Sequence, residues 1–233
     1  MKNKLVLFDI DQTILHSGGA GEKALTLALR ERFGDKAGLG GIEIAGKTDL
    51  WIAQRIFESQ GEQPTPEKVM QLLEAYLSHL KGQLAANNGR LLPGFPDLML
   101  ALARLPHVAV GLLTGNLRRG ARIKLAHYGM LEHFSLEENA AGAFADDSHD
   151  RNQLGPHARR RANAQHSTDF QPSDIFVIGD TPHDIACAKA FNARGVGVAT
   201  GRYDRASLEA AGADFVFDDL SDVDGVIHTL GLA

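Results

Sequence analysis

The sequence predicts an α/β fold in which a parallel β-sheet carries helices on both faces and a helical unit is inserted near the N-terminus. Short apolar runs alternate with segments of helical periodicity along most of the chain, as in a parallel sheet with helical crossovers. Only helical patterns separate the first apolar run from the next, over about 70 residues, whereas a direct β–α–β unit needs roughly 30. We therefore expect an inserted domain at residues 17–88 and a core domain formed by residues 1–16 and 89–233.

The first expected strand and the insert follow from local patterns. Residues 5–8 form an apolar run of strand-forming side chains, and the glycine-rich stretch 18–21 should be a linker into the insert. Apolar residues recur at helical spacing over 25–33 and 52–57, so each stretch should contain a helix. A third helix over 65–86 should begin at a Thr-Pro pair, a cap residue followed by proline at the first helical position.

The rest of the chain should supply the remaining sheet and its covering helices. Further strands are expected at 108–113, 134–144, 175–178, 196–198 and 215–217. Helices are expected at 95–103, 117–128, 157–166, 182–193 and 206–211, and a polar loop at 145–156. This order predicts parallel strands whose carboxyl ends meet at one edge.

Composition limits the classes of function. The 233 residues are 44% hydrophobic and 23% charged, with a formal net charge of −5. The acidic excess argues against a nucleic-acid partner, and no apolar run approaches the roughly 20 residues of a membrane span. Cys187 is the one cysteine, so no intrachain disulfide can form. Together with the absence of a signal-peptide pattern, this favours a cytoplasmic location.

Polar signatures follow three of the expected strands. They are Asp9/Asp11/Thr13, Thr114/Gly115/Asn116 and Gly179/Asp180. Ligands of open parallel sheets bind beyond the carboxyl ends of the strands, where all three signatures fall. Ionised aspartates are rarely buried without a partner, and two close together repel each other. A hard divalent cation such as Mg²⁺, which takes oxygen ligands, would resolve this repulsion.

These signatures resemble the motifs of the haloacid dehalogenase superfamily of hydrolases. Asp9-Ile10-Asp11-Gln12-Thr13 looks like the first motif, DxDxT, and the strand that ends in Thr114 looks like the second. The segment from Gly179 to Asp184 looks like the fourth, GDxxxD. The order and approximate spacing match across nearly the whole chain. The resemblance implies a Rossmann-like core, and the insert lies where this superfamily places its helical type-1 cap.

The resemblance also implies a covalent, Mg²⁺-dependent phosphatase mechanism. Asp9 would attack phosphorus to form an aspartyl-phosphate, and Asp11 would act as general acid and then general base. A carboxylate oxygen of Asp9, the backbone carbonyl of Asp11 and the carboxylate of Asp180 would hold Mg²⁺. Residues 114–116, at a helix N-terminus, would bind phosphate oxygens.

The third motif is the one at which the chain departs from the superfamily pattern. The usual residue there is a lysine, but no lysine lies between Lys124 and Lys189. We expect Arg151 to supply this cation and to bind phosphate in the fork geometry of a guanidinium. The three arginines at 159–161 remain alternatives: Arg159, Arg160 and Arg161.

Four features have a structural interpretation beside the functional one. Thr13 could satisfy backbone groups of its turn, and Asn116 could be only the N-cap of the next helix. Asp184 could form a capping box with Thr181 or support the metal site. The segment 46–49, which resembles a cap segment of phosphoglycolate-phosphatase-like members, could contact substrate or only start a helix.

The expected function is therefore Mg²⁺-dependent hydrolysis of a small phosphorylated metabolite, phosphoglycolate or a similar phosphomonoester. A phosphosugar mutase of the same superfamily is an alternative, because it would use the same first motif. A dehalogenase would need neither Asp11 nor Asp180. A catalytically silent phosphate-binding or phospho-acceptor protein is the remaining alternative. Asp11 counts against it, since a phospho-acceptor needs no second carboxylate to activate water.

Overall fold

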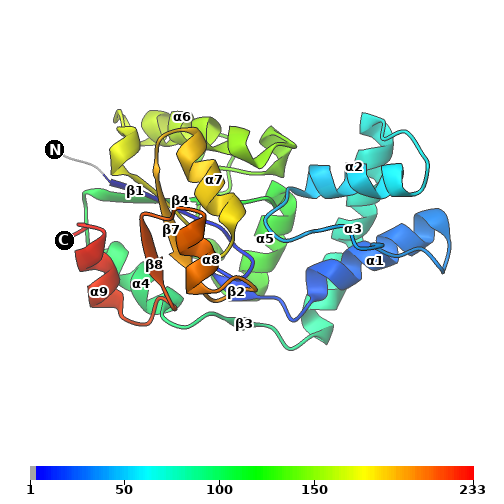
Figure 1. Cartoon of the computed structure of the whole chain (residues 1–233), viewed down its shortest axis with the longest axis horizontal. Coiled ribbons are helices and arrows are strands. Elements are labelled where there is room, and N and C mark those ends of the chain that lie inside the picture. Colours follow the sequence, from blue (N-terminus) through cyan, green and yellow to red (C-terminus); the bar gives the residue numbers. More distant parts are fainter. Residues whose placement is uncertain (1–3) are drawn as a thin grey trace.

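The computed structural model describes residues 4–233 and contains a sheet-bearing lobe beside a helical lobe (Figure 1). The predicted α/β class is confirmed, because all six strands of the main sheet run parallel in the order β5-β4-β1-β6-β7-β8. The six strands are β1 (Lys4–Phe8), β4 (Val108–Leu113), β5 (Gly142–Ala143), β6 (Ile175–Gly179), β7 (Arg194–Val198) and β8 (Phe215–Phe217).

Helices cover both faces of this sheet, as the sequence predicts. Val6 and Phe8 of β1 pack against α4 (Phe95–Leu102), α5 (Arg118–His127) and α9 (Val223–Thr229). Leu5 and Leu7 point to the other face, where α6 (Leu154–His166) and α7 (Pro182–Ala190) lie, with α8 (Arg205–Ala210) beside β7. Burial on both faces explains why β1 is a continuous apolar run rather than an alternating one.

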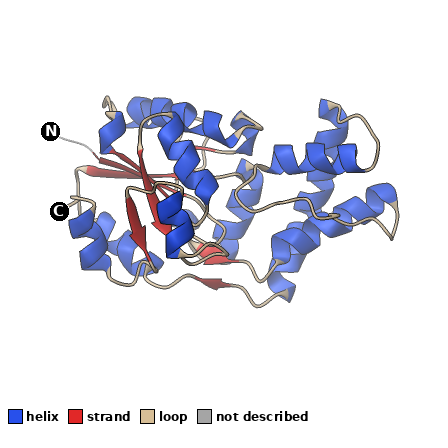
Figure 2. Cartoon of the chain, in the orientation of Figure 1, coloured by secondary structure: helices blue, strands red, loops and turns tan. Residues whose placement is uncertain are grey.

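The helical lobe contains α1 (Ala20–Phe33), α2 (Asp49–Ser59) and α3 (Pro66–Ala86) (Figure 2). Their apolar faces pack together in a cluster separate from the two sides of the sheet. Two short antiparallel strands, β2 (Leu15–His16) and β3 (Arg90–Leu91), pair where the chain leaves and re-enters the sheet-bearing lobe. One expectation is wrong here: α1 begins at Ala20, so the linker is shorter than residues 18–21.

Two further expectations need correction. Only Gly142–Ala143 of the segment 134–144 joins the sheet, because Phe134 and Leu136 are buried as loop side chains against the core instead. The segment 145–156 is not a simple loop, since α6 already begins at Leu154 and packs closely on α7. The short 3₁₀ turns of the structure are η1 (Leu131–His133), η2 (Ala145–Asp147), η3 (Arg151–Gln153) and η4 (Pro172–Asp174).

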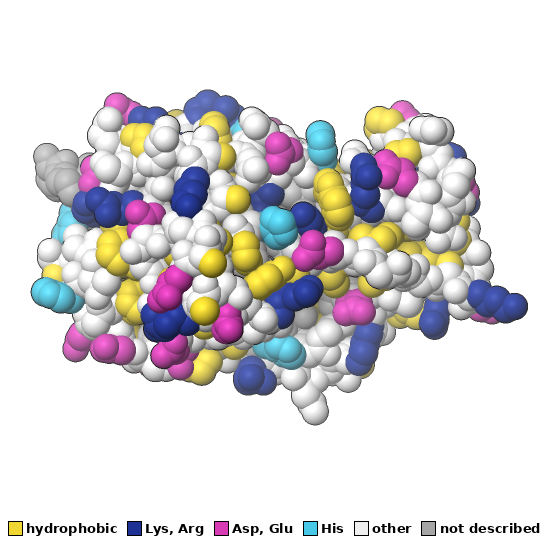
Figure 3. All heavy atoms as spheres, viewed as in Figure 1, with side chains coloured by type: hydrophobic (Ala, Val, Ile, Leu, Met, Phe, Trp, Pro, Cys, Tyr) yellow, Lys and Arg dark blue, Asp and Glu magenta, His cyan; other side chains and the backbone are white. Residues whose placement is uncertain are grey.

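Basic and acidic side chains are intermixed over the face of the molecule shown in Figure 3, without a large area of one sign. Within residues 4–233, no helix combines the length and the apolar character that crossing a membrane requires.

Candidate active site

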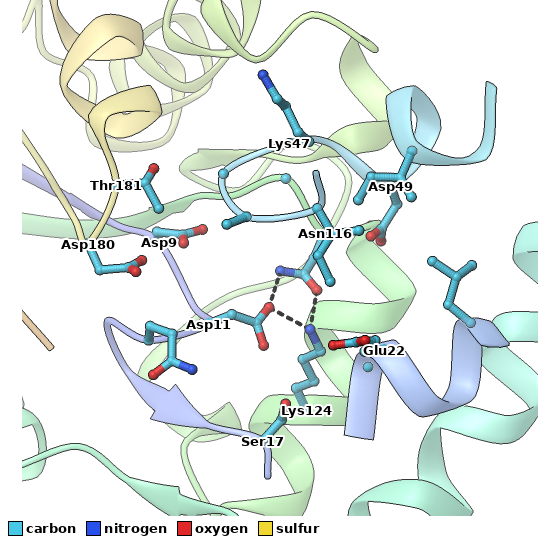
Figure 4. Close-up of a pocket in the computed structure, with 18 of the residues that line it drawn as sticks. Asp9, Asp11, Ser17, Glu22, Lys47, Asp49, Asn116, Lys124, Asp180 and Thr181 are labelled. Carbon is cyan, nitrogen blue, oxygen red and sulfur yellow. Dashed lines mark hydrogen bonds and ion pairs between the residues drawn. The ribbon is translucent and has the colours of Figure 1, made fainter. Parts of the chain in front are cut away.

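A cavity of about 380 Å³ lies between the carboxyl edge of the sheet and the helical lobe (Figure 4). Residues from the ends of β1, β4 and β6 line it together with residues of the insert. The predicted site residues in the lining are Asp9, Asp11, Gly115, Asn116, Arg151 and Asp180. Thr114 is fully buried next to them and bonds to Asn116. The structure thus brings together the three signatures that lie far apart in the sequence.

The chain reverses direction directly after β1, and this reversal presents Asp11 to the cavity. The amide of Gln12 donates to the carbonyl of Leu15 over 2.7 Å, and Gln12 adopts a left-handed φ of 63°. Such a conformation is unusual for a residue other than glycine. The buried hydroxyl of Thr13 has no hydrogen-bond partner within residues 4–233. The interpretation that this hydroxyl satisfies backbone groups of the turn is therefore wrong.

Asp9 is a buried carboxylate with an incompletely satisfied oxygen. Its exposed fraction is 5%, and its Oδ1 lies 3.1 Å from Nη2 of Arg151. No hydrogen bond of good geometry from the described residues reaches this oxygen. Burial raises the pKa of Asp9 to about 6, although Arg151 and the Thr114 hydroxyl act in the opposite direction. The site therefore leaves a negatively charged oxygen available to a further cation or an electrophile.

Arg151, the expected third-motif cation, points into this site. It is 7% exposed and begins the turn η3, in which the side chain of Asp150 accepts from the amide of Asn152. Besides Asp9, its guanidinium pairs with the fully buried Asp184 and donates to the carbonyl of Gly46 over 3.3 Å. Arg151 thus connects the nucleophile candidate, the fourth motif and the insert.

The alternative arginines are engaged elsewhere. Arg159 pairs with Asp169, Arg161 forms two 2.6 Å bonds to Asp147, and Arg160 contacts a histidine of its own helix. None of the three lines the cavity.

Three buried carboxylates could share a metal ion. One oxygen from each of Asp9, Asp180 and Asp184 lies within 4.8 Å of the other two. Burial, followed by the charges of Asp184 and Asp9, raises the pKa of Asp180 to about 9. Repulsion of this kind, together with the unsatisfied oxygen of Asp9, fits an all-oxygen site for a hard divalent cation. The residues therefore suit Mg²⁺.

Asp184 forms the capping box that its sequence context suggests and also pairs with Arg151. Its Oδ2 accepts from the amide and the hydroxyl of Thr181, at 3.0 and 2.7 Å, so the capping box exists. Its Oδ1 pairs with Arg151. The same carboxylate thus starts α7 and holds the guanidinium next to Asp9.

Asn116 is not the N-cap of α5, because Leu117 occupies that position. Its amide nitrogen instead donates to Oδ2 of Asp11 and to the Thr114 hydroxyl, both over 2.9 Å. The amide oxygen accepts from the ammonium of Lys124 over 2.6 Å, and the same ammonium donates to Oδ2 of Asp11 over 2.5 Å (Figure 4). Asp11 is therefore part of a closed network.

Lys124 is a site residue that the sequence reasoning missed. Its side chain is 4% exposed and it lies on the buried face of α5 with Ala121 and Leu125. Burial acts to lower the pKa of Lys124, but the acidic groups around it, Asp11 first, raise it, so the ammonium stays charged. The available signal is positional: Leu117, Ala121 and Lys124 share one helical stripe, and a lysine on an apolar stripe needs a partner.

The segment 46–49 of the insert closes over the sheet edge. Thr48 caps α2 by accepting from the amide of Trp51, and its hydroxyl donates to a carbonyl of the core over 2.6 Å. The amide of Asp49 donates to the carbonyl of Gly115, and its carboxylate accepts from the amide of Leu117, both over 2.7 Å. A Cβ at Gly115 would lie 2.2 Å from a carbonyl oxygen of this segment, so glycine is required there. The segment both starts a helix and lines the cavity.

Known proteins resemble this chain in sequence and in fold. The chain is 24% identical over 223 residues to a phosphoglycolate phosphatase of Synechococcus elongatus, and the match covers 94% of each chain. The fold is similar to that of a hydrolase from Pseudomonas syringae, with a TM-score of 0.75 and 22% identity over 97% of this chain and 99% of that one. CbbY from Rhodobacter sphaeroides, solved in complex with phosphate, gives a TM-score of 0.74 with 19% identity, covering 95% and 96%.

The family model for haloacid dehalogenase-like hydrolases matches residues 6–189, which include the second half of β1, all of β4 and β6, and the polar residues that follow each of these strands. The chain belongs to the haloacid dehalogenase-like hydrolase family.

Proposed function

We propose that the protein is a Mg²⁺-dependent phosphatase that hydrolyses a small phosphomonoester through an aspartyl-phosphate on Asp9. One observation carries this proposal: a buried carboxylate opens into the cavity with Arg151 beside it and two further carboxylates behind it. An anionic nucleophile can approach an anionic phosphate only where fixed positive charge offsets the repulsion. Arg151 provides part of that positive charge, and the carboxylate cluster is suited to bind a metal ion that would provide the rest.

The proposed roles follow from position. An oxygen of Asp9 forms a bond to phosphorus while the bond to the leaving oxygen breaks, and Asp11 gives its proton to that oxygen. In the second step Asp11 takes a proton from water, whose oxygen bonds to phosphorus as the bond to Asp9 breaks. We assign Thr114, Gly115, Asn116 and Arg151 to the non-transferred phosphate oxygens, with Thr13 and Asp184 in support.

We assign Mg²⁺ to the carboxylates of Asp9 and Asp180 and the backbone carbonyl of Asp11. When bound there, the ion would supply the charge compensation that the cluster lacks. Asp184 would maintain the arrangement through its contacts to Arg151 and Thr181.

We further propose that residues 17–88 act as a cap that excludes water and receives the leaving group. The contacts of segment 46–49 with the sheet edge support this role, since they hold the insert closed over Asp9 and Asp11. A cavity of about 380 Å³ suits a small metabolite. The name of the Synechococcus relative supports phosphoglycolate as the first substrate to test.

The test is a phosphate-release screen over small phosphomonoesters, with and without Mg²⁺, on the protein and on Asp9→Asn. We expect Mg²⁺-dependent release that the Asp9→Asn variant loses while remaining folded. Retained turnover in that variant would contradict the role of Asp9. Phosphate binding without release would favour the silent phosphate-binding alternative. Formation of an isomeric phosphate without release would favour the mutase alternative.

A further inference from the structure

We propose that Lys124 is a positioning residue that orients the carboxyl group of Asp11 toward the leaving oxygen. The inference rests on the proposed phosphatase function, because Lys124 would act through Asp11 and not on the substrate. Lys124 lies outside the four sequence motifs, on α5, and reaches the site from the core side of the cavity.

Lys124 and Asn116 both donate to the same oxygen of Asp11. The ammonium of Lys124 and the amide nitrogen of Asn116 donate to Oδ2, over 2.5 and 2.9 Å. The Asp11 side chain is 38% exposed at the edge of the cavity, so it would otherwise be free to rotate. With Oδ2 held by two donors, Oδ1 is the oxygen left for a proton and for the substrate.

The three side chains form a closed ring of hydrogen bonds. Lys124 donates to Asp11 and to Asn116, and Asn116 donates to Asp11, so each of the three side chains is fixed by the other two. Asn116 is in turn anchored on the Thr114 hydroxyl at the end of β4. The orientation of Asp11 is therefore fixed by contacts to the sheet and not by its own exposed loop alone.

Lys124 is a buried charge, and its packing does not require one. A charged group in this position must be removed from water, which costs free energy that a methionine of similar length would avoid. Residue 21 of α1 is a glycine, and a Cβ there would lie 3.8 Å from the Lys124 ammonium and 4.0 Å from the Tyr76 hydroxyl. The insert therefore leaves room above the ammonium, and its Asp49 helps to raise the pKa of Lys124 but forms no ion pair with it among the described residues. The ammonium is paired with Asp11 and Asn116.

The test uses a series of aryl phosphates whose phenols differ in pKa, and it compares Lys124→Met with the unmodified protein. A good leaving group departs without a proton, whereas a poor one depends on the general acid. If Lys124 positions Asp11, kcat/KM in Lys124→Met should fall by about 10- to 100-fold for the poorest leaving groups and by less than about threefold for the best. The plot of log kcat/KM against leaving-group pKa should become steeper for Lys124→Met, so that its slope approaches that of the Asp11→Asn variant. Because kcat/KM reports the steps up to aspartyl-phosphate formation, hydrolysis of the intermediate does not enter.

The matched control is Lys4→Met. Lys4 forms another lysine–aspartate pair, with Asp174 over 2.5 Å, at the opposite end of β1. This variant should leave the slope unchanged. Lys124→Gln retains an N–H donor and should give the same steepening to a smaller degree, which covers the case that Lys124→Met does not fold. A parallel loss for all leaving groups would overturn the proposal, and so would an unchanged line. If the unmodified protein hydrolyses none of the series, the proposed function fails and not this inference alone.

Discussion

Replacement of Arg151 by methionine tests the electrostatic design of the site. Methionine keeps an apolar stem of similar length, so the change removes mainly the guanidinium. The carboxylates of Asp9 and Asp184 would then remain buried beside Asp180 without the cation that contacts them. We expect a large loss of stability when no divalent cation is present.

The magnitude follows from the geometry. At the 3.1 Å separation of Arg151 and Asp9, the attraction is about 5 kcal/mol for an effective dielectric constant of roughly 20. Breaking a buried pair and leaving one partner uncompensated typically costs about 3–5 kcal/mol. We therefore expect the free energy of unfolding of Arg151→Met to fall by about 3–5 kcal/mol in the presence of a chelator.

The assay is urea unfolding with chelator and with saturating Mg²⁺. Ligand at about 100 times its Kd stabilises a protein by about 2.7 kcal/mol, and the variant's more negative site should gain at least as much as the unmodified site. Arg161→Met is the matched control, because Arg161 forms a partly buried pair with Asp147 away from the cavity. It should lose stability without any change in the Mg²⁺ increment. A loss below about 1 kcal/mol in Arg151→Met, or a smaller Mg²⁺ increment than in the unmodified protein, would refute the reasoning.

Three further predictions concern the metal, the insert and pH. Mg²⁺ should raise the melting temperature of the protein but not of Asp180→Asn; equal increments would contradict the metal site. Gly115→Ala should lower the free energy of unfolding by about 1–3 kcal/mol, because its Cβ would meet the segment 46–49; unchanged urea unfolding would count against the tight contact. Burial raises the pKa of Asp49 from 3.8 to about 6. Ionisation of Asp49 therefore destabilises the fold: the loss of stability is absent below pH 3.8, grows as the pH rises, and is complete above about pH 6. Asp49→Asn should therefore be more stable than the unmodified protein at pH 7 and show a flatter stability profile between pH 4 and 6; superimposable profiles would contradict this.

The parts of the fold and site that sequence reasoning captured depend on short-range patterns. The strand Val108–Leu113 is bounded by turn residues and coincides with β4, and Asp9, Asp11 and Asp180 each follow a strand within a few residues. Parallel topology then implies that these strand ends meet, which the sheet order confirms.

The parts that were missed depend on contacts between distant segments. β2 and β3 are two residues long and form only because the chain returns from the insert beside its point of departure. The strand predicted over 134–144 is limited to Gly142–Ala143, because only these two residues pair with β4. Lys124 interacts with Asp11, 113 positions away, and its own helix gives no indication of which carboxylate it meets.

Formation of a phosphoryl bond on Asp9 is the step on which the proposed function depends. Borohydride reduces an aspartyl-phosphate to homoserine, so rapid mixing with substrate and Mg²⁺, followed by borohydride and peptide mass spectrometry, reports the site of attack. We expect homoserine at position 9 in a substrate- and Mg²⁺-dependent manner, and none in Asp9→Asn. Substrate turnover without modification of residue 9, or modification of another aspartate such as Asp11 or Asp180, would contradict the mechanism.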